Sequence, residues 1–225
     1  MSIRSIRVAL LLIAALPLAG FAADDPKDVK EIRESVKNFV NAIGKGDALE
    51  AKRHAASDQV TSTLIDAVIP LMKASNQLDA TSIKAFGAQQ GPVFQRQANP
   101  LAALAPFARA ADTGQVEIKG NDARISLMPP QTQPANGDPD QQYVNPRNPN
   151  NYLYLRFEAD AWRVNLSAMP NTRQMVQAAP MLKAVAEAMN QTSEQIRQGM
   201  YANVQEAQTG MRQNLRAATQ RARGQ

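Results

Sequence analysis

The sequence contains no cysteine and only one histidine, His54, among its 225 residues. Without cysteine there can be no disulfide, no thiol nucleophile and no thiolate metal site. A single imidazole also excludes nearly all metal centres and catalytic triads that depend on histidine. Phosphate-binding loops, nucleophile elbows, zinc-protease helices and calcium-binding loops are absent as well. We therefore expect neither a metal nor a cofactor.

The one long hydrophobic run lies at the N-terminus and is typical of a secretory signal peptide. Arg4 and Arg7 precede an apolar stretch over residues 8–18, and the small residues Gly20 and Ala22 occupy the −3 and −1 positions of a cleavage site. The apolar stretch is about eleven residues long, whereas a membrane-spanning helix needs ~20. No cysteine follows it, which excludes lipid attachment at that point. We expect residues 1–22 to be removed and the mature protein to be periplasmic or secreted.

Positive charge is unevenly distributed. Loss of Arg4 and Arg7 with the leader lowers the net charge from +5 to +3, so the basic character is no sign of nucleic-acid binding. After Glu206 the chain has no acidic residue but carries four arginines, Arg212, Arg216, Arg221 and Arg223. These four are candidates for contact with an acidic partner or, at most peripherally, an acidic membrane surface. The alternative is an ordinary solvated basic helix end.

The N-terminal part of the mature chain has helical periodicity. Apolar residues recur at a spacing of 3.6 from residue 26 to residue 43, and Gly44 is predicted to end this helix. A D-x-x-E capping box at Asp47 opens a second helix. Ser57 is predicted to cap a third, which Pro70 should kink or split. Residues 81–111 are predicted to form short helical pieces joined by turns.

Two β-hairpins are predicted downstream, at residues 115–127 and 152–167, because apolar and polar residues alternate there around turn sequences. Between them, residues 129–151 are rich in proline and could be an ordered lid or disordered. One apolar cluster is expected between helix and sheet, formed by Phe39, Val40, Ile118, Ile125, Leu155, Phe157, Trp162 and Val164.

Helical periodicity returns from Asn171, with a break or kink expected at Pro180. The apolar stripe of the last helix is thin, and Gly199 and Gly210 are predicted to weaken it. An isolated helix of this kind is marginal in water. We therefore expect this tail to be mobile until it meets a partner, a second copy of the chain or an anionic surface.

Helices followed by antiparallel strands and a hairpin around a tryptophan resemble the superfamily of nuclear transport factor 2 and ketosteroid isomerase. The segments that carry the likeness are FVNA at 39–42 with GDA at 46–48, VEIKGNDARI at 116–125, LRFE at 155–158 and WRV at 162–164. The resemblance implies an α+β fold in which N-terminal helices pack on a curved antiparallel sheet that forms a cone. That domain would cover residues 23–168, and residues 169–225 would be a helical C-terminal extension.

Candidate ligand-binding residues follow from the second hairpin. Tyr152, Tyr154 and Arg156 lie on the strand face opposite the apolar row and could line a pocket in which the arginine pairs with an anionic ligand. They could equally be ordinary cross-strand pairs on a half-exposed sheet. His54 follows Lys52 and Arg53 on a helix expected to be exposed, and no carboxylate partner is assigned to it at helical spacing.

These features favour an exported, non-catalytic protein of the cell envelope, with no catalytic residue assigned. It would bind a small apolar ligand in the cone, or a partner protein through the helical tail, with a homodimer as a further possibility. The alternative is an isomerase or dehydratase that uses His54 or a buried carboxylate, for which Asp58, Asp66 and Asp79 are the candidates.

The leader generates the first prediction. N-terminal sequencing of exported protein should begin at Ala23, because Gly20 and Ala22 provide the small residues that signal peptidase requires. A mature chain that keeps Met1 and fractionates with membranes would contradict this assignment.

Overall fold

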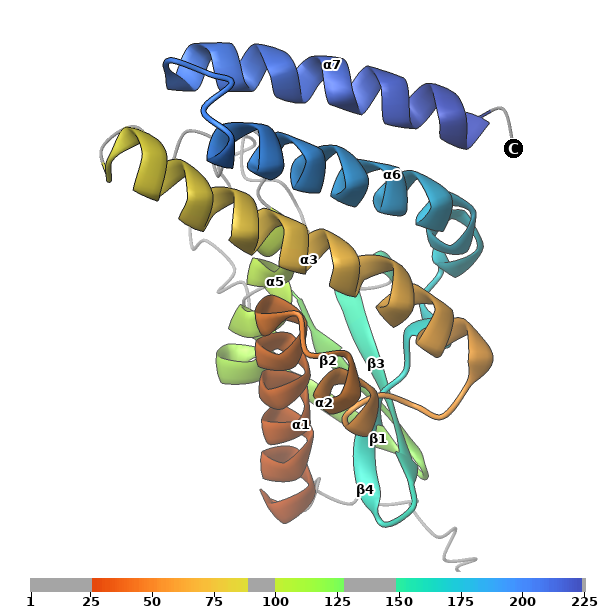
Figure 1. The fold of residues 1–225 in the computed structure, drawn as a ribbon. Coiled ribbons are helices and arrows are strands. Elements are labelled where there is room, and N and C mark those ends of the chain that lie inside the picture. The colour runs from red at the N-terminus through yellow and green to blue at the C-terminus, as the bar shows by residue number, and fades with distance from the viewer. Residues whose placement is uncertain (1–25, 89–99, 128–148, 224–225) are drawn as a thin grey trace, which may run out of the picture.

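The computed structural model of the chain describes residues 26–88, 100–127 and 149–223 (Figure 1). The predicted signal peptide and most of residues 129–151 lie outside the described residues, and Pro149–Asn151 form a short 3₁₀ turn before the second hairpin. The helices and strands, in chain order, are α1 (Pro26–Lys45), α2 (Ala48–Arg53), α3 (Gln59–Phe86), α5 (Pro100–Thr113), β1 (Val116–Lys119), β2 (Asp122–Ser126), β3 (Tyr152–Glu158), β4 (Ala161–Val164), α6 (Thr172–Arg197) and α7 (Val204–Arg223).

The sheet confirms both predicted hairpins. Its four antiparallel strands follow one another in the order β1-β2-β3-β4. Gly120 turns the chain between β1 and β2 with a φ of 61°. Between β3 and β4 the two central residues, Ala159 and Asp160, have φ values of 49° and 58°. This conformation suits the right-handed twist of a two-residue hairpin, but it normally selects asparagine and glycine.

The predicted apolar cluster is also confirmed. All eight expected residues belong to one core between the helices and the sheet, six of them buried and Ile118 and Phe157 packed against its margin. The Trp162 ring lies 5.4 Å from the Phe157 ring, and its indole nitrogen donates to Asp28 of α1 at 3.4 Å. Helices on one face of an antiparallel sheet make this an α+β fold, as predicted.

Two helix boundaries differ from the predicted ones. α1 ends at Lys45 rather than before Gly44, because Gly46 adopts the positive φ of 72° and donates to Ile43, while Asp47 donates to Ala42. These two bonds define a Schellman motif, which needs its glycine one position past the helix. α2 begins at the predicted Asp47 cap.

α3 is capped by Asp58, not by Ser57. The Asp58 carboxylate accepts from the amide of Thr61 at 2.8 Å and from its hydroxyl at 2.7 Å. An aspartate N-cap typically contributes about 1 kcal/mol to helix stability.

The prolines do not break their helices. α3 is one helix of 28 residues that contains Pro70, and α6 is one helix of 26 residues that contains Pro180. Ile69 and Leu71, on either side of Pro70, are buried, and this packing offsets the hydrogen bond that proline cannot donate. The described parts of residues 81–111 are also less fragmented than predicted, since α3 extends to Phe86 and α5 is one helix over Pro100–Thr113.

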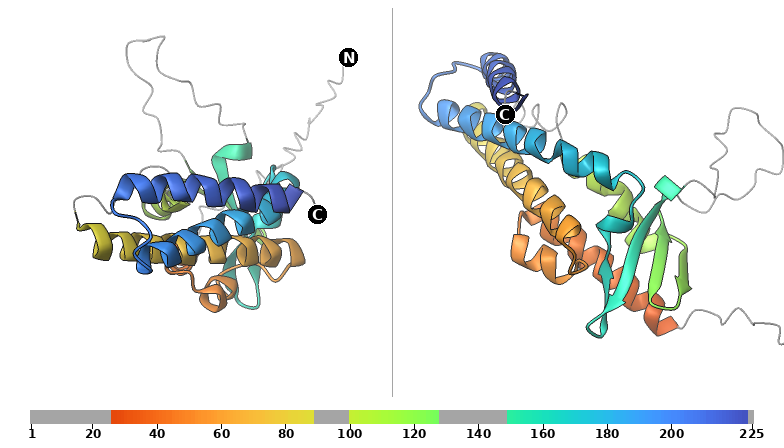
Figure 2. Two further views of the ribbon diagram at one scale, coloured as in Figure 1. Left: turned by 45° about the horizontal axis from the view of Figure 1, so that its top comes forward. Right: turned by 90° about the vertical axis from the view of Figure 1, so that its right-hand side faces the viewer.

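The C-terminal helices form a layer on the other side of α3. α6 lies along α3, and α7 returns antiparallel on top of α6 (Figures 1 and 2). A second apolar cluster joins the three helices, with Leu71 and Leu78 from α3, Met189 from α6 and Val204 from α7. The C-terminal helices therefore pack on the rest of the chain in this structure, whereas the sequence predicted a tail that becomes ordered only on a partner, a second copy or an anionic surface. Among the described residues, no helix is both long and apolar enough to cross a bilayer.

The two hairpin turns generate a matched prediction. Ala159→Gly should raise the free energy of unfolding by about 0.5–1 kcal/mol, because glycine adopts a positive φ without steric cost. Gly120→Ala should lower it by a similar amount, since a β-carbon there meets no neighbouring atom and only the backbone is strained. Urea denaturation of both variants measures the two effects, and shifts of the same sign would contradict the turn geometry.

Candidate binding surface on the helical layer

In the described part of the chain, buried apolar side chains of the helices and the sheet pack together in one core. Among those no more than 5 % exposed are Ile32, Val36, Phe39, Ile125, Leu153 and Val164. The cone expected from the resemblance would need open volume at this position to hold a ligand. The packed side chains at this position direct attention to the surface.

The structure brings Tyr152, Tyr154 and Arg156 together on the outer face of the sheet. The Arg124 guanidinium lies 4.3 Å from the centre of the Tyr152 ring, and the Tyr154 hydroxyl donates to the Pro149 carbonyl at 3.3 Å. Arg156 forms an exposed ion pair with Asp122 across the strands at 3.4 Å. The contacts of Tyr152 with Arg124 and of Arg156 with Asp122 run between β2 and β3, as the second interpretation predicts.

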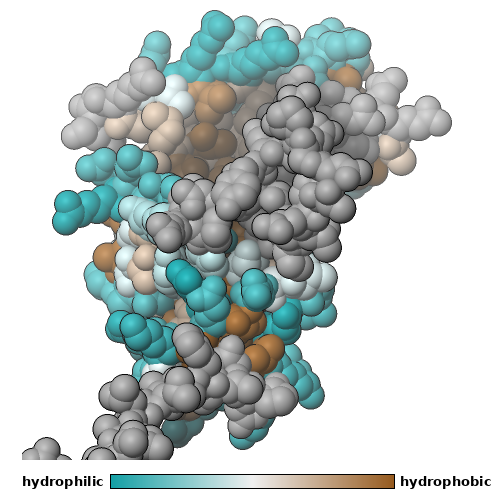
Figure 3. Space-filling view, turned by 180° about the vertical axis from the view of Figure 1, so that it is seen from behind, coloured by the Kyte–Doolittle hydropathy of each residue, from teal (hydrophilic) through white to brown (hydrophobic). Residues whose placement is uncertain are grey.

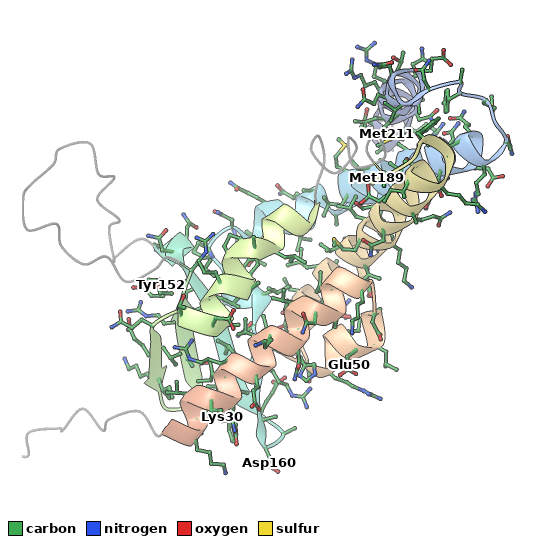
Figure 4. The ribbon with its side chains drawn as sticks, turned by 90° about the vertical axis from the view of Figure 1, so that its left-hand side faces the viewer. Lys30, Glu50, Tyr152, Asp160, Met189 and Met211 are labelled. Atoms are coloured by element: carbon green, nitrogen blue, oxygen red, sulfur yellow. The ribbon has the colours of Figure 1, made fainter. Side chains whose placement is uncertain are left out.

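Arg124 is also bound by Glu117 of β1 at 2.6 Å, and this hydrogen bond, partly offset by burial, raises the pKa of Arg124 above its usual value. Two ion pairs therefore link neighbouring strands on the outer face of the sheet. Figure 4 shows Tyr152 on the sheet and Asp160 at the hairpin tip, far from Met189 and Met211 in the helical layer.

His54 does have a carboxylate partner, so the expectation of none is wrong. Glu50 lies four residues earlier on α2, and its Oε1 is 3.2 Å from His54 Nε2, while Oε2 pairs with Arg53. The four-residue spacing of Glu50 and His54 was visible in the sequence and could have predicted this pair. Of the candidate carboxylates, Asp58 caps α3 and Asp66 forms an exposed pair with Lys52 at 2.7 Å. Within the described ranges, no three histidine, aspartate or glutamate residues come together in a group that could hold a metal ion.

Buried polar side chains fix how α7 lies on α6. The Asn214 amide donates to Thr192 at 3.0 Å and to Gln195 at 2.7 Å, and both Asn214 and Thr192 are buried. Tyr201, in the connection between the helices, donates to the same Gln195 oxygen at 2.6 Å. A buried polar group without its partner is costly, so this network selects one register.

The two glycines predicted to weaken the tail have structural roles instead. Gly199 has a φ of 70° and ends α6, where its amide donates to Ile196 at 3.0 Å. A β-carbon at Gly210 would collide with the Tyr201 ring, so only glycine lets this ring rest on α7. Burial there raises the pKa of the Tyr201 hydroxyl above its usual value.

Two of the four predicted arginines lie unpaired on this layer. Arg212 and Arg216 are exposed, one turn apart on α7, and neither has an ion-pair partner among the described residues. Arg221 pairs with Glu187 of α6 at 2.6 Å. Arg223 is the last residue of α7, and its side chain lies outside the described part of the structure.

A surface groove of about 380 Å³ runs along the same helix. It is lined by Tyr201, Gln205, Glu206, Thr209, Gly210 and Gln213. Seen from behind, hydrophilic side chains form the upper rim of the molecule, where α7 lies, and apolar residues gather beneath this rim (Figure 3). The outer face of α7 and the adjoining connection therefore combine cationic, aromatic and amide groups with one carboxylate, that of Glu206.

The sequence interpretation missed Tyr201 and Asn214, and it assigned Gly210 only a weakening effect on the helix. One signal could have identified Asn214: the contact positions of α7 recur at 204, 207, 211, 214 and 218, and an asparagine occupies one of them. A polar residue within such a stripe often specifies register. The partner of Gly210 could not be inferred, because it depends on the path of the connection at Tyr201.

No family model, no curated protein and no solved structure matches this chain. What the protein does must therefore be argued from its own residues.

The contact between Tyr201 and Gly210 generates a double-mutant prediction. Gly210→Ala should destabilise the protein by roughly 1–3 kcal/mol, because the added methyl group displaces a packed ring. In a Tyr201→Ala background the same change should instead stabilise it by about 0.5–1 kcal/mol, since alanine is the better helix former. Thermal denaturation of the four proteins measures the cycle. Equal effects in both backgrounds would show that Tyr201 does not rest on Gly210.

Proposed function

We propose that the protein is an exported, non-catalytic interaction protein of the cell envelope, which binds an acidic partner protein through the outer face of α7. Export rests on the leader-like sequence of residues 1–22. The observation that carries the binding role is the pair Arg212 and Arg216, which are exposed and have no ion-pair partner among the described residues, on a helix that buried contacts hold in place.

The chemistry of this face suits protein recognition. Arginine and tyrosine are enriched where interfaces are strongest, because they combine flat contact area with several hydrogen-bond donors. The groove beside Tyr201 offers the adjoining contact area, and the amides of Gln205 and Gln213 can donate or accept there. Because α7 is fixed on α6 before binding, the partner would not have to offset the cost of ordering a free helix.

The buried apolar side chains between the helices and the sheet, among them Ile125, Leu153 and Val164, favour this role over a small apolar ligand in a cone. His54 lies in a surface pair with Glu50, and Asp58 and Asp66 are engaged as a cap and an ion pair. These positions lend no support to a carboxylate or imidazole base working in a closed pocket. An acidic membrane surface would attract the same arginines, and binding to anionic phospholipid vesicles distinguishes this alternative from a protein partner.

The proposal is tested by placing a photo-cross-linking amino acid at Thr209, which is exposed, lines the groove and lies on the same helix as the arginines. Irradiation of cells that export this protein should give one discrete protein adduct. Arg212→Glu together with Arg216→Glu should reduce its yield about tenfold or more, because two attractive charges become repulsive.

The matched control is Lys30→Glu together with Lys45→Glu on α1, which makes the same change in charge on an exposed helix elsewhere. This control should leave the adduct unchanged. An adduct that survives reversal of the arginines, or falls equally in the control, would contradict the proposal. Binding of the purified protein to anionic phospholipid vesicles, lost on arginine reversal and with no protein adduct in cells, would assign the surface to the membrane instead.

A further inference from the structure

The two edge strands of the sheet, β1 and β4, differ in whether another described segment pairs with them. At the β4 edge, the amide of Val164 donates to His54 and its carbonyl accepts from Ala56, both at 2.8 Å, so residues 54–56 add a short parallel bridge. At the other edge, no described segment pairs with the outer side of β1. Strand order and Figure 2 place β1 at the open margin of the sheet.

The hydrogen-bond pattern identifies which groups of β1 are unpaired. The amide of Ser126 donates to the carbonyl of Gln115 at 2.9 Å, and these residues are opposite each other in the register. Bonded and non-bonded pairs alternate in an antiparallel ladder. Glu117 and Lys119 therefore face β2 with their backbone groups, whereas Val116 and Ile118 direct their N–H and C=O groups away from the sheet.

The side chains of β1 are self-complementary. An antiparallel copy of the strand, related by a two-fold axis at Ile118, would place Glu117 opposite Lys119 of the second copy, and the reverse. Lys119 is exposed and has no ion-pair partner among the described residues. Both hydrogen bonds that Arg124 donates to Glu117 go to the same carboxylate oxygen, Oε2. The other oxygen, Oε1, can therefore accept from Lys119 of the second copy.

We propose that two copies of this protein associate through β1, antiparallel and centred on Ile118, to form one continuous eight-stranded sheet. The two Ile118 residues form the central bonded pair, and each donates its amide to the carbonyl of the other. Two Glu117–Lys119 pairs flank this centre. The face involved lies on the sheet, so this association is independent of the partner contact proposed for α7.

The short length of β1 limits the affinity of this dimer. β1 has four residues, so the contact is small, and association should depend on concentration in the micromolar to millimolar range. A two-fold axis uses the free edge of each copy completely, which closes the assembly at two. The charges at 117 and 119 permit only the register in which opposite signs meet.

The test is sedimentation equilibrium of the mature protein with the variants Lys119→Glu and Glu117→Lys. Each variant alone faces a like charge at both flanking positions, so its self-association should weaken about tenfold. An equimolar mixture of the two variants restores both opposite-charge pairs and should return to within about threefold of the wild-type association. A fold defect in either variant would not be rescued by mixing.

Lys84→Glu serves as the matched control, because it makes the same change in charge at an exposed position of α3. Its association should equal that of the wild-type protein. Ile118→Pro should abolish the dimer, since it removes an amide that points away from β2 and leaves the ladder within the sheet intact. A wild-type protein that stays monomeric up to about 1 mM would overturn the proposal, as would variants that associate normally or a mixture that shows no rescue.

Discussion

The structure depends on the burial of α3 on both of its flanks. One side contributes Leu64, Ile65 and Met72 to the core beneath the sheet, and another contributes Leu71 and Leu78 to the cluster with α6 and α7. A helix with apolar residues around most of its circumference must be covered on all sides. The sheet and its N-terminal helices cover one side, and the C-terminal helices cover the other. The sheet domain and the helical layer are therefore coupled through one shared element.

Within the layer, α7 is held by close fit more than by apolar area. Its seam with α6 is built from small residues, among them Ala184, Ala188 and Ala218, which let the two helices approach closely. Such residues bury little surface, so hydrophobic burial alone would leave α7 weakly held. The Asn214 bonds and the ring of Tyr201 over Gly210 provide the specificity that the alanines lack. The outer face of α7 is thereby free to be polar and cationic.

Local patterns in the sequence predicted the parts of the fold that local physics determines. Alternating residues defined both hairpins, and the Trp162 cluster followed from which strand positions share a face. Effects of tertiary contacts were not predictable in this way. Pro70 stays within one helix because its neighbours are buried, and the C-terminal helices are covered by α3, whose second apolar flank the periodicity had not revealed.

The residues of the candidate site likewise divide into those that local sequence could predict and those that depend on tertiary contacts. The arginines of α7 were visible as a run without acids, but their separation into an unpaired couple and a paired Arg221 depends on the position of Glu187 on the neighbouring helix. The pair of His54 and Glu50 was open to prediction, since their spacing is helical, and was missed. The sequence indicated only that Gly210 weakens the helix, because the tyrosine that packs against it, Tyr201, lies outside α7.

Amide hydrogen exchange of the free mature protein, followed by mass spectrometry at low micromolar concentration, tests the shared role of α3 most directly. If α3 joins the two clusters into one unit, peptides from α7 should exchange with protection comparable to that of β3 and β4, away from the frayed helix ends. Complete exchange of α7 within seconds, while the sheet stays protected, would show that the helical layer is not part of the folded unit and would contradict this account.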